Sequence, residues 1–269
     1  MSLTDFNMFS WPRFVGLSNY FRMFLDDDVF TIALRNTIIL TVVTGPTGFL
    51  MSFIFAWGIN ELRPRFRSML TLAFYAPTLA GSVYFIWKFI FAGDSYGLLN
   101  SWLLRLGFTS EAIAWLTDPK YNMTILIILI LWMSAGAGFL AFIAGLQSLD
   151  SELFEAGAID GIRNRFQELW FITLPQMKPQ ILLASVFTIA GAFSIGAQSS
   201  ALLGFPSTDN SGQTLLLHIL DYGWLRREFG YASAVQLFLL VIMLVTFYTI
   251  SKLLAKWGTS DPKNKAADE

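Results

Sequence analysis

Five long apolar segments dominate this chain and leave few folds open to it. They cover residues 37–59, 69–91, 122–146, 180–204 and 231–253. Each is close to the roughly 20 residues that a helix needs to cross about 30 Å of hydrocarbon. Segments this long and this apolar do not fit the two-sided helices of a soluble domain. We therefore predict an all-α polytopic membrane protein with five spans.

The composition supports a bilayer protein and excludes several other classes. Hydrophobic residues make up 55% of the 269 positions and charged residues only 14%, whereas soluble domains carry about 25% charged residues. The net charge of −1 offers no basic surface for nucleic acid. Because the chain has no cysteine, disulfides and thiolate metal sites are excluded.

One polar stretch, residues 150–179, separates the third apolar segment from the fourth. Asp150 or Ser151 can cap a short helix here, and Gly161 then stops it, since glycine tolerates the left-handed conformation that ends a helix. The apolar positions of this helix are Leu153, Phe154, Ala156 and Ile159. The pattern predicts a short amphipathic helix followed by a sharp turn.

A second short helix is expected directly after that turn. Asn164, with Gln167 three residues later, can start it, and we expect it to end before Pro175. One side carries Phe166, Leu169 and Trp170. From these residues alone, the stretch is either a connector lying on the membrane surface or a docking element for a soluble partner.

The same stretch resembles the EAA loop of ABC importer permeases. The resemblance is carried by Glu155-Ala156-Gly157, Asp160-Gly161, Phe166, Ile172, Leu174 and Pro175. It implies the fold of a type I ABC importer transmembrane domain, whose loop docks into a cleft of an ATP-hydrolysing subunit. The residues that it assigns to ATPase coupling are Glu155, Ala156, Gly157, Asp160, Gly161, Phe166 and Pro175.

The resemblance also implies individual roles within this loop. Glu155 contributes charge at the docking surface, Gly161 allows a sharp turn and close approach, and Pro175 fixes the exit into the next span. Gly157 departs from the family pattern, which usually has alanine at this place. Glycine there costs roughly 0.5–1 kcal/mol of helix stability relative to alanine.

Similarity to carbohydrate-importing permeases extends over most of the chain. It is carried outside the loop by residues 14–20 (FVGLSNY), 96–100 (YGLLN) and 229–234 (FGYASA). In that family the first of these motifs follows a transmembrane helix, so the family's first helix is expected to be absent here. We accordingly divide the chain into an outer-face interfacial segment (1–36), a transmembrane permease domain (37–258) with a cytoplasmic coupling loop (150–179), and a cytoplasmic polar tail (259–269).

Basic residues in the short loops predict the orientation. Residues 60–68 hold Arg63, Arg65 and Arg67, whereas the much longer loop 92–121 holds only two basic residues. Cytoplasmic loops carry the excess of lysine and arginine. We therefore expect residues 60–68, residues 147–179 and the C-terminus in the cytoplasm, with 92–121 and 205–229 outside.

The sequence lacks the residues for ATP binding, for a metal site and for ion-coupled transport. The chain has no G-x-x-x-x-G-K-[ST] phosphate loop, so ATP and Mg²⁺ are expected in partner subunits and not here. His218, the single histidine, cannot build a metal site alone and is expected in a solvated outer loop. No Asp or Glu lies well inside a predicted span, which weighs against a proton- or sodium-coupled carrier.

A few weakly polar or aromatic residues near the middle of the spans are candidates for the solute path. They are Trp132, Ser134, Phe187, Ser194 and Gln198. Ser194 and Gln198 are four apart and so share one helix face, with Phe187 about two turns earlier. A sugar site needs an aromatic surface with hydroxyl or amide partners. The serine and glutamine side chains could equally serve hydrogen bonding between helices, worth about 0.6 kcal/mol on average.

The leading hypothesis is the membrane-spanning permease of an ABC importer for an oligosaccharide or related polyol. It places the chain in an inner (plasma) membrane, multi-pass, with its C-terminus cytoplasmic. The implied partners are a second permease subunit, two ATP-binding subunits, an extracytoplasmic solute-binding protein and membrane lipid. The alternatives are an ATP-independent secondary carrier or channel, and a membrane scaffold that only assembles with other proteins.

Overall fold

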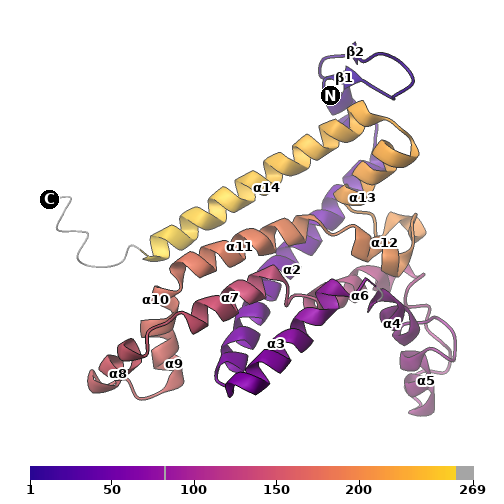
Figure 1. Ribbon diagram of the computed structural model, residues 1–269. Helices are drawn as coiled ribbons and strands as arrows, with labels where there is room; N and C mark the ends of the chain where they lie inside the picture. Colours follow the sequence, from indigo (N-terminus) through magenta and orange to yellow (C-terminus); the bar gives the residue numbers. More distant parts are fainter. Residues whose placement is uncertain (82, 259–269) are drawn as a thin grey trace.

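The described part of the computed structural model, residues 1–81 and 83–258, is built almost entirely from helices (Figure 1). The exception is a small antiparallel hairpin of β1 (Thr4–Asp5) and β2 (Arg13–Phe14), in which Thr4 lies opposite Phe14. The polar tail expected at 259–269 lies outside the described residues.

Three helical segments in the described part are long and apolar enough to cross a membrane. They are α2 (Asp28–Asn60), the segment Pro119–Gln147 that joins α6 (Pro119–Trp132) to α7 (Ala137–Gln147), and α14 (Phe229–Gly258). Two bent pairs pass the same test: α3 (Pro64–Leu79) with α4 (Val83–Ile90), and α11 (Lys178–Phe193) with α12 (Ala197–Leu203). Counting each pair as one span gives up to five spans, the number that the sequence predicts.

Helix breaks interrupt three of the five expected spans, which the apolar pattern does not show. The axes of α3 and α4 differ by 82° and those of α11 and α12 by 44°. Gly81, Gly136 and Gly196 lie in the three breaks. Glycine leaves the helical conformation at little cost, so it permits each break without making it visible in a hydropathy profile.

The first spanning helix begins earlier than its apolar segment. Asp27 caps α2, and its carboxylate accepts a hydrogen bond from the Phe30 N–H at 2.9 Å. A capped start at Asp28 adds residues 28–36, which we expected in the interfacial segment, to the first long helix. The helix then continues unbroken through Pro46 to Asn60.

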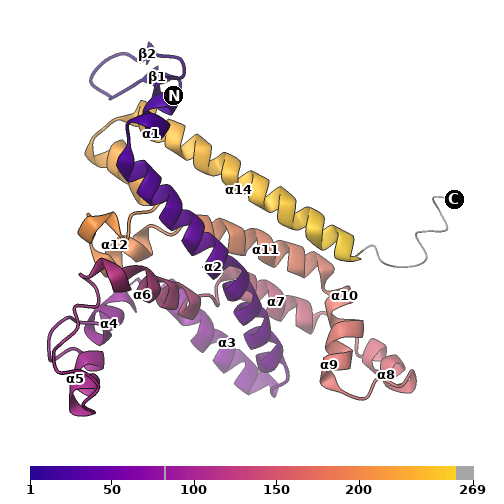
Figure 2. The same cartoon turned by 180° about the vertical axis from the view of Figure 1, so that it is seen from behind.

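Helix α2 is the central element, and it packs against α6, α7, α11 and α13 (Figure 2). One hydrophobic cluster joins α2 to α7 and α11 through Ala56, Phe142 and Ala184. Gly138 of α7 allows a close approach there, because a Cβ atom at this position would lie 3.3 Å from the Ala184 carbonyl oxygen. Small residues let neighbouring membrane helices approach closely.

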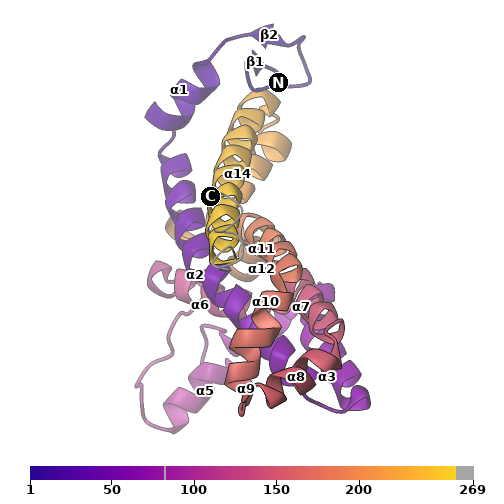
Figure 3. The same cartoon turned by 90° about the vertical axis from the view of Figure 1, so that its left-hand side faces the viewer.

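The helices give the molecule two distinct ends (Figures 1 and 3). At one end, Ile59, Leu149, Leu174 and Leu254 contribute to a single hydrophobic cluster, and helix α8 (Ser151–Ile159) lies there too. We call it the α8 end. The other, the hairpin end, holds the β-hairpin, α1 (Ser18–Leu25) and α13 (Leu215–Leu220), which all contact α14 or its neighbours. Helix α5 (Leu98–Arg105) packs against α4 and lies away from the hairpin. The three segments expected on the cytoplasmic side therefore meet at one end of the molecule.

Candidate coupling loop and solute cavity

Helix α8 (Ser151–Ile159) opens the polar stretch at the α8 end. Asp150, one of the two expected caps, accepts a hydrogen bond from the Glu152 N–H at 3.0 Å. Gly161 follows the helix in the left-handed conformation, with φ +94°, as its predicted role requires. A Cβ atom on Gly161 would find no atom within 4 Å, so the turn needs glycine for its backbone conformation and not for close approach within this chain.

The apolar residues of α8 do not all face the protein. Phe154 is half-buried and Gly157 is buried, whereas Leu153, Ala156 and Ile159 are exposed. The side chain of Ile159 is 87% exposed. Glu155 and Asp160 are also exposed, so α8 presents a mixed apolar and acidic surface outward.

Gly157, where the family pattern usually has alanine, lies close to two isoleucine side chains. A Cβ atom at this position would lie 2.6 Å from Ile172 Cδ1 and 3.1 Å from Ile162 Cδ1. These distances are shorter than a normal carbon–carbon contact of about 3.5–4.0 Å. Glycine therefore lets α8 lie directly against the helical segment that contains Ile172.

The second helix starts as predicted but does not end before Pro175. The Asn164 side chain accepts from the Gln167 N–H at 2.8 Å, and the Gln167 side chain accepts from the Arg163 N–H at 2.9 Å. Helix α9 (Arg165–Glu168) then continues through a π-helical turn (Leu169–Thr173), α10 (Leu174–Gln176) and α11. The predicted end is wrong because the wide turn before Pro175 accommodates its ring and its missing N–H.

Two backbone hydrogen bonds carry the helix across Met177. The Met177 N–H donates to the Thr173 carbonyl at 3.0 Å, and the Ile181 N–H donates to the Met177 carbonyl at 2.8 Å. No loop therefore separates the polar stretch from the next apolar segment.

Charged and aromatic contacts join α9 to the end of α2. Arg165 Nη2 lies 3.1 Å from Glu61 Oε2, and Arg165 Nη1 lies 2.7 Å from Glu168 Oε2. The ring centroids of Phe166 and Trp57 are 5.8 Å apart, although Phe166 is 73% exposed. The start of α9 is thus tied to the end of α2.

A cavity of about 370 Å³ lies where the broken helices meet. Its walls come from α2, α3, α4, α7, α11 and α12 together with the break between α6 and α7. The lining side chains that carry hydroxyl, amide or aromatic groups are Thr44, Thr78, Tyr84, Ser134, Phe187, Thr188 and Gln198. None of the described residues that line it is charged.

Three of the five candidates for the solute path line this cavity: Ser134, Phe187 and Gln198. The hydroxyl of Ser134 is buried and has no hydrogen-bond partner, whereas those of Thr44 and Thr188 donate to carbonyls of their own helices. Ser134 therefore offers an unused donor. Sequence reasoning missed Thr44, Thr78, Tyr84 and Thr188, whose only signal was a polar group within an apolar segment.

The other two candidates lie elsewhere. The Trp132 ring packs on Trp87, with centroids 5.7 Å apart. Ser194 follows the end of α11 and donates to the Ala190 carbonyl at 2.7 Å. The expectation that Ser194 and Gln198 share one helix face is wrong, because the helix breaks between them.

His218 is not in a solvated loop as expected; it is fully buried at the hairpin end. Its Nε2 lies 3.1 Å from Asp27 Oδ2, and the Tyr231 hydroxyl donates to the same oxygen at 2.7 Å. Burial by itself would raise the pKa of Asp27, but the hydrogen bonds from His218 and Tyr231 outweigh it and hold this pKa well below its usual range. No local sequence pattern indicates this network, whose members are about 190 to 200 residues apart.

Comparisons with known proteins agree with this architecture. A family model described as "binding-protein-dependent transport system inner membrane component" matches residues 46–257. The arabinooligosaccharides transport system permease protein of Bacillus subtilis is 33% identical over 89% of this chain and 76% of its own length. The lactose transport system permease protein of Rhizobium radiobacter is 31% identical over 86% of this chain and 77% of its own length.

Solved structures show the same fold. A chain of a bacterial alginate ABC transporter, crystallised with an alginate pentasaccharide-bound periplasmic protein, aligns with a TM-score of 0.76 at 24% identity. The alignment covers 91% of this chain and 84% of that one. With its helical architecture and a family match that spans most of its length, this chain belongs to the binding-protein-dependent transport system inner membrane components, the permease subunits of ABC importers.

Proposed function

We propose that this permease imports an oligosaccharide or a related polyol, and that residues 150–179 couple it to two ATP-hydrolysing subunits. The observation that carries the solute class is the cavity at the helix breaks. Its lining combines hydroxyl and amide groups with the Phe187 and Tyr84 rings and has no charged side chain among the described residues. Sugars present hydroxyls and apolar ring faces, which such a lining complements. Relatives named for arabinooligosaccharides and lactose support the same class.

The coupling proposal rests on how α8 meets the helix that follows it. Exposed Glu155 and Ile159 offer a surface for a partner, while Gly157 lies against Ile172 on the other side. Closure of two ATPase subunits against the exposed side of α8 would push α8 toward the helical segment that contains Ile172. Because the helix continues into α11, the push reaches Phe187 and Thr188 in the cavity wall.

The proposal also implies which end of the molecule faces which side of the membrane. The α8 end and the C-terminal end of α14 face the cytoplasm, and the hairpin end faces outward. ATP and Mg²⁺ belong to the ATPase subunits, a second permease completes the solute path, and an extracytoplasmic binding protein delivers the solute. The carrier or channel alternative needs none of these subunits.

Affinity purification from the native membrane tests the coupling. The tagged chain should retain an ATPase and a second permease, and Glu155→Lys should lose the ATPase because it reverses the charge on the exposed side of α8. Glu111→Lys, an exposed acid in the loop before α6, should retain it as the matched control. If the chain purifies alone and still moves a sugar across vesicles, the coupling proposal fails and the carrier alternative replaces it.

Uptake kinetics in the reconstituted assembly test the solute class. Phe187→Ala should raise the KM for an oligosaccharide about 10-fold, because it removes an aromatic surface from the cavity. Phe85→Ala removes an exposed phenylalanine of α4 that does not line the cavity and should leave KM unchanged. Equal effects of the two changes, or uptake of amino acids in preference to sugars, would contradict this assignment.

A further inference from the structure

The first 25 residues turn apolar side chains away from the rest of the protein. On α1 and its cap, Leu17, Phe21, Phe24 and Leu25 are 58%, 61%, 55% and 75% exposed. Their spacing of four, seven and eight residues places them in one stripe along the helix. Met23 on the opposite side is fully buried. The helix is therefore amphipathic, with its apolar stripe outward.

The hairpin before α1 also exposes apolar side chains. Met8, Phe9, Trp11 and Phe14 are 66%, 75%, 91% and 77% exposed. Exposed apolar surface on this scale marks a protein or membrane contact. Tryptophan and phenylalanine next to a spanning segment are typical of the membrane–water interface.

The stripe adjoins the exposed apolar side of α14. The Phe24 ring lies 5.4 Å from the Phe238 ring of α14 in an edge-on contact. Next to Phe238, Leu237 and Val241 are 46% and 50% exposed. Only 6% of the apolar window of α14 is buried within this chain, so most of this helix is open to contact with lipid. The apolar side of α1 extends that surface at the point where α14 begins.

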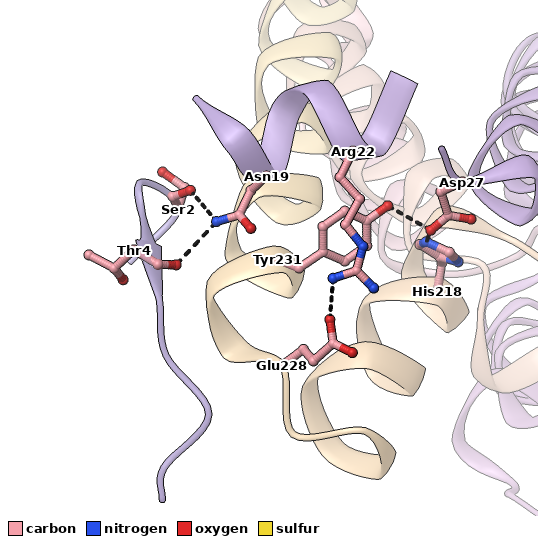
Figure 4. A network of polar contacts seen from close by, with 8 residues as sticks. All are labelled: Ser2, Thr4, Asn19, Arg22, Asp27, His218, Glu228 and Tyr231. Carbon is pink, nitrogen blue, oxygen red and sulfur yellow. Dashed lines mark hydrogen bonds and ion pairs between the residues drawn. The ribbon is translucent and has the colours of Figure 1, made fainter. Parts of the chain in front are cut away.

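Polar contacts hold the N-terminal segment in this orientation (Figure 4). The Asn19 amide donates to the carbonyls of Ser2 and Thr4 at 2.8 and 3.1 Å. The Gly230 N–H donates to the Phe6 carbonyl at 3.1 Å. A Cβ atom on Gly230 would lie only 2.0 Å from the Thr4 carbonyl oxygen, so only glycine admits the segment here. Gly230 of the FGYASA motif (229–234) thus allows the N-terminal segment to pack against the start of α14.

A second set of contacts fixes α1 itself. The Arg22 guanidinium forms an ion pair with Glu228 and lies 4.6 Å from the centroid of the Tyr231 ring. Asp27, directly after α1, bonds to His218 and Tyr231 (Figure 4). All these polar groups lie on the inner side, so α1 cannot turn its apolar stripe inward without breaking them.

We infer that the hairpin tip and the outer stripe of α1 form a membrane anchor seated in the lipid headgroup–acyl boundary at the hairpin end. The occupant is lipid, because the patch extends the side of α14 that is open to contact with lipid. Amphipathic helices bind in this way by burying their apolar side at the interface. The exposed Arg13 lies opposite Asp5 in the hairpin, and Asp26 and Asp28 follow α1. With basic and acidic groups both present, the anchor relies on apolar burial and does not need anionic headgroups.

The absence of cysteine from the chain makes a direct test simple. Single cysteines replace Trp11, Phe21 or Leu25, and a nitroxide is attached to each in the assembly reconstituted into phosphatidylcholine nanodiscs. Collision of the nitroxide with oxygen, which concentrates in the bilayer, is compared with collision with a water-soluble nickel chelate. Asp5→Cys and Glu111→Cys, at exposed polar positions, serve as matched controls.

The three apolar positions should favour oxygen over nickel at least threefold more than the two controls do. Nickel-dominated collisions at Phe21 and Leu25 would place the stripe in water and overturn the inference. Low collision rates with both reagents, together with an immobilised spectrum, would mean that a protein subunit covers the patch, and would overturn it equally. The labelled positions are exposed, so the label should not disturb the fold. Retention of the partner subunits checks this for each labelled variant. The inference does not depend on the solute or on ATPase coupling, so it can fail while the proposed function stands.

Discussion

Gly157→Ala restores the residue that the family pattern usually has, yet we expect it to destabilise this protein. The new Cβ atom would lie 2.6 Å from Ile172 Cδ1, about 1 Å closer than a normal contact. Overpacking of this kind costs about 1–3 kcal/mol, while replacing glycine in a helix returns about 0.5–1 kcal/mol. The net loss is therefore at most about 2.5 kcal/mol. At about 2–4 °C per kcal/mol for a chain of this size, Tm should fall by up to about 10 °C.

Ile172→Val provides the matched test, since it removes the Cδ1 atom that alanine would meet. Alone it should cost about 0.5–1.5 kcal/mol. Combined with Gly157→Ala it should cost no more than Ile172→Val by itself, so the favourable coupling in a double-mutant cycle should be as large as the loss for Gly157→Ala alone. Thermal unfolding in detergent measures all four proteins, and solute-stimulated ATPase activity of the assembly shows whether coupling follows stability. Additive effects, or a rise in Tm for Gly157→Ala alone, would refute the reasoning.

Three further predictions concern other positions. Gly161→Ala should lower stability by about 1–2 kcal/mol, because its φ of +94° is left-handed, and Gly161→Asn should lose less; thermal scans that show equal losses would contradict this. The pKa of Asp27 is lower in the folded than in the unfolded state, so its stabilising contribution is present above about pH 4 and disappears as the pH falls further. Asp27→Asn should accordingly lower Tm at neutral pH and flatten the acid dependence, whereas an unchanged acid limb would argue against the network with His218. Asn100, fully buried, donates to three backbone carbonyls and accepts from the Trp115 indole; Asn100→Ala should cost about 3 kcal/mol or more, and Asn100→Asp should not rescue it, because the new oxygen would face the carbonyls.

Much of this architecture can be predicted from residues that are close together in the sequence. The apolar segments predict the spans because hydrocarbon satisfies no backbone group, so each crossing must be helical. The Asp150 cap, the Asn164–Gln167 start and the left-handed Gly161 were also predictable, since each depends on residues within a few positions of one another. Membership of the permease family followed from motifs in the loop and at both ends.

Other features required the tertiary structure. The glycines at 81, 136 and 196 permit helix breaks, but only packing between spans decides that the helices bend there and leave a cavity between them. That packing brings Ser134 and Phe187 together and separates Ser194 from Gln198. It also draws His218 out of an expected loop into a bond with Asp27. Local propensity and hydropathy report on neighbours along the chain, whereas these contacts join groups up to about 190 residues apart. Their energies exist only once the helices have assembled.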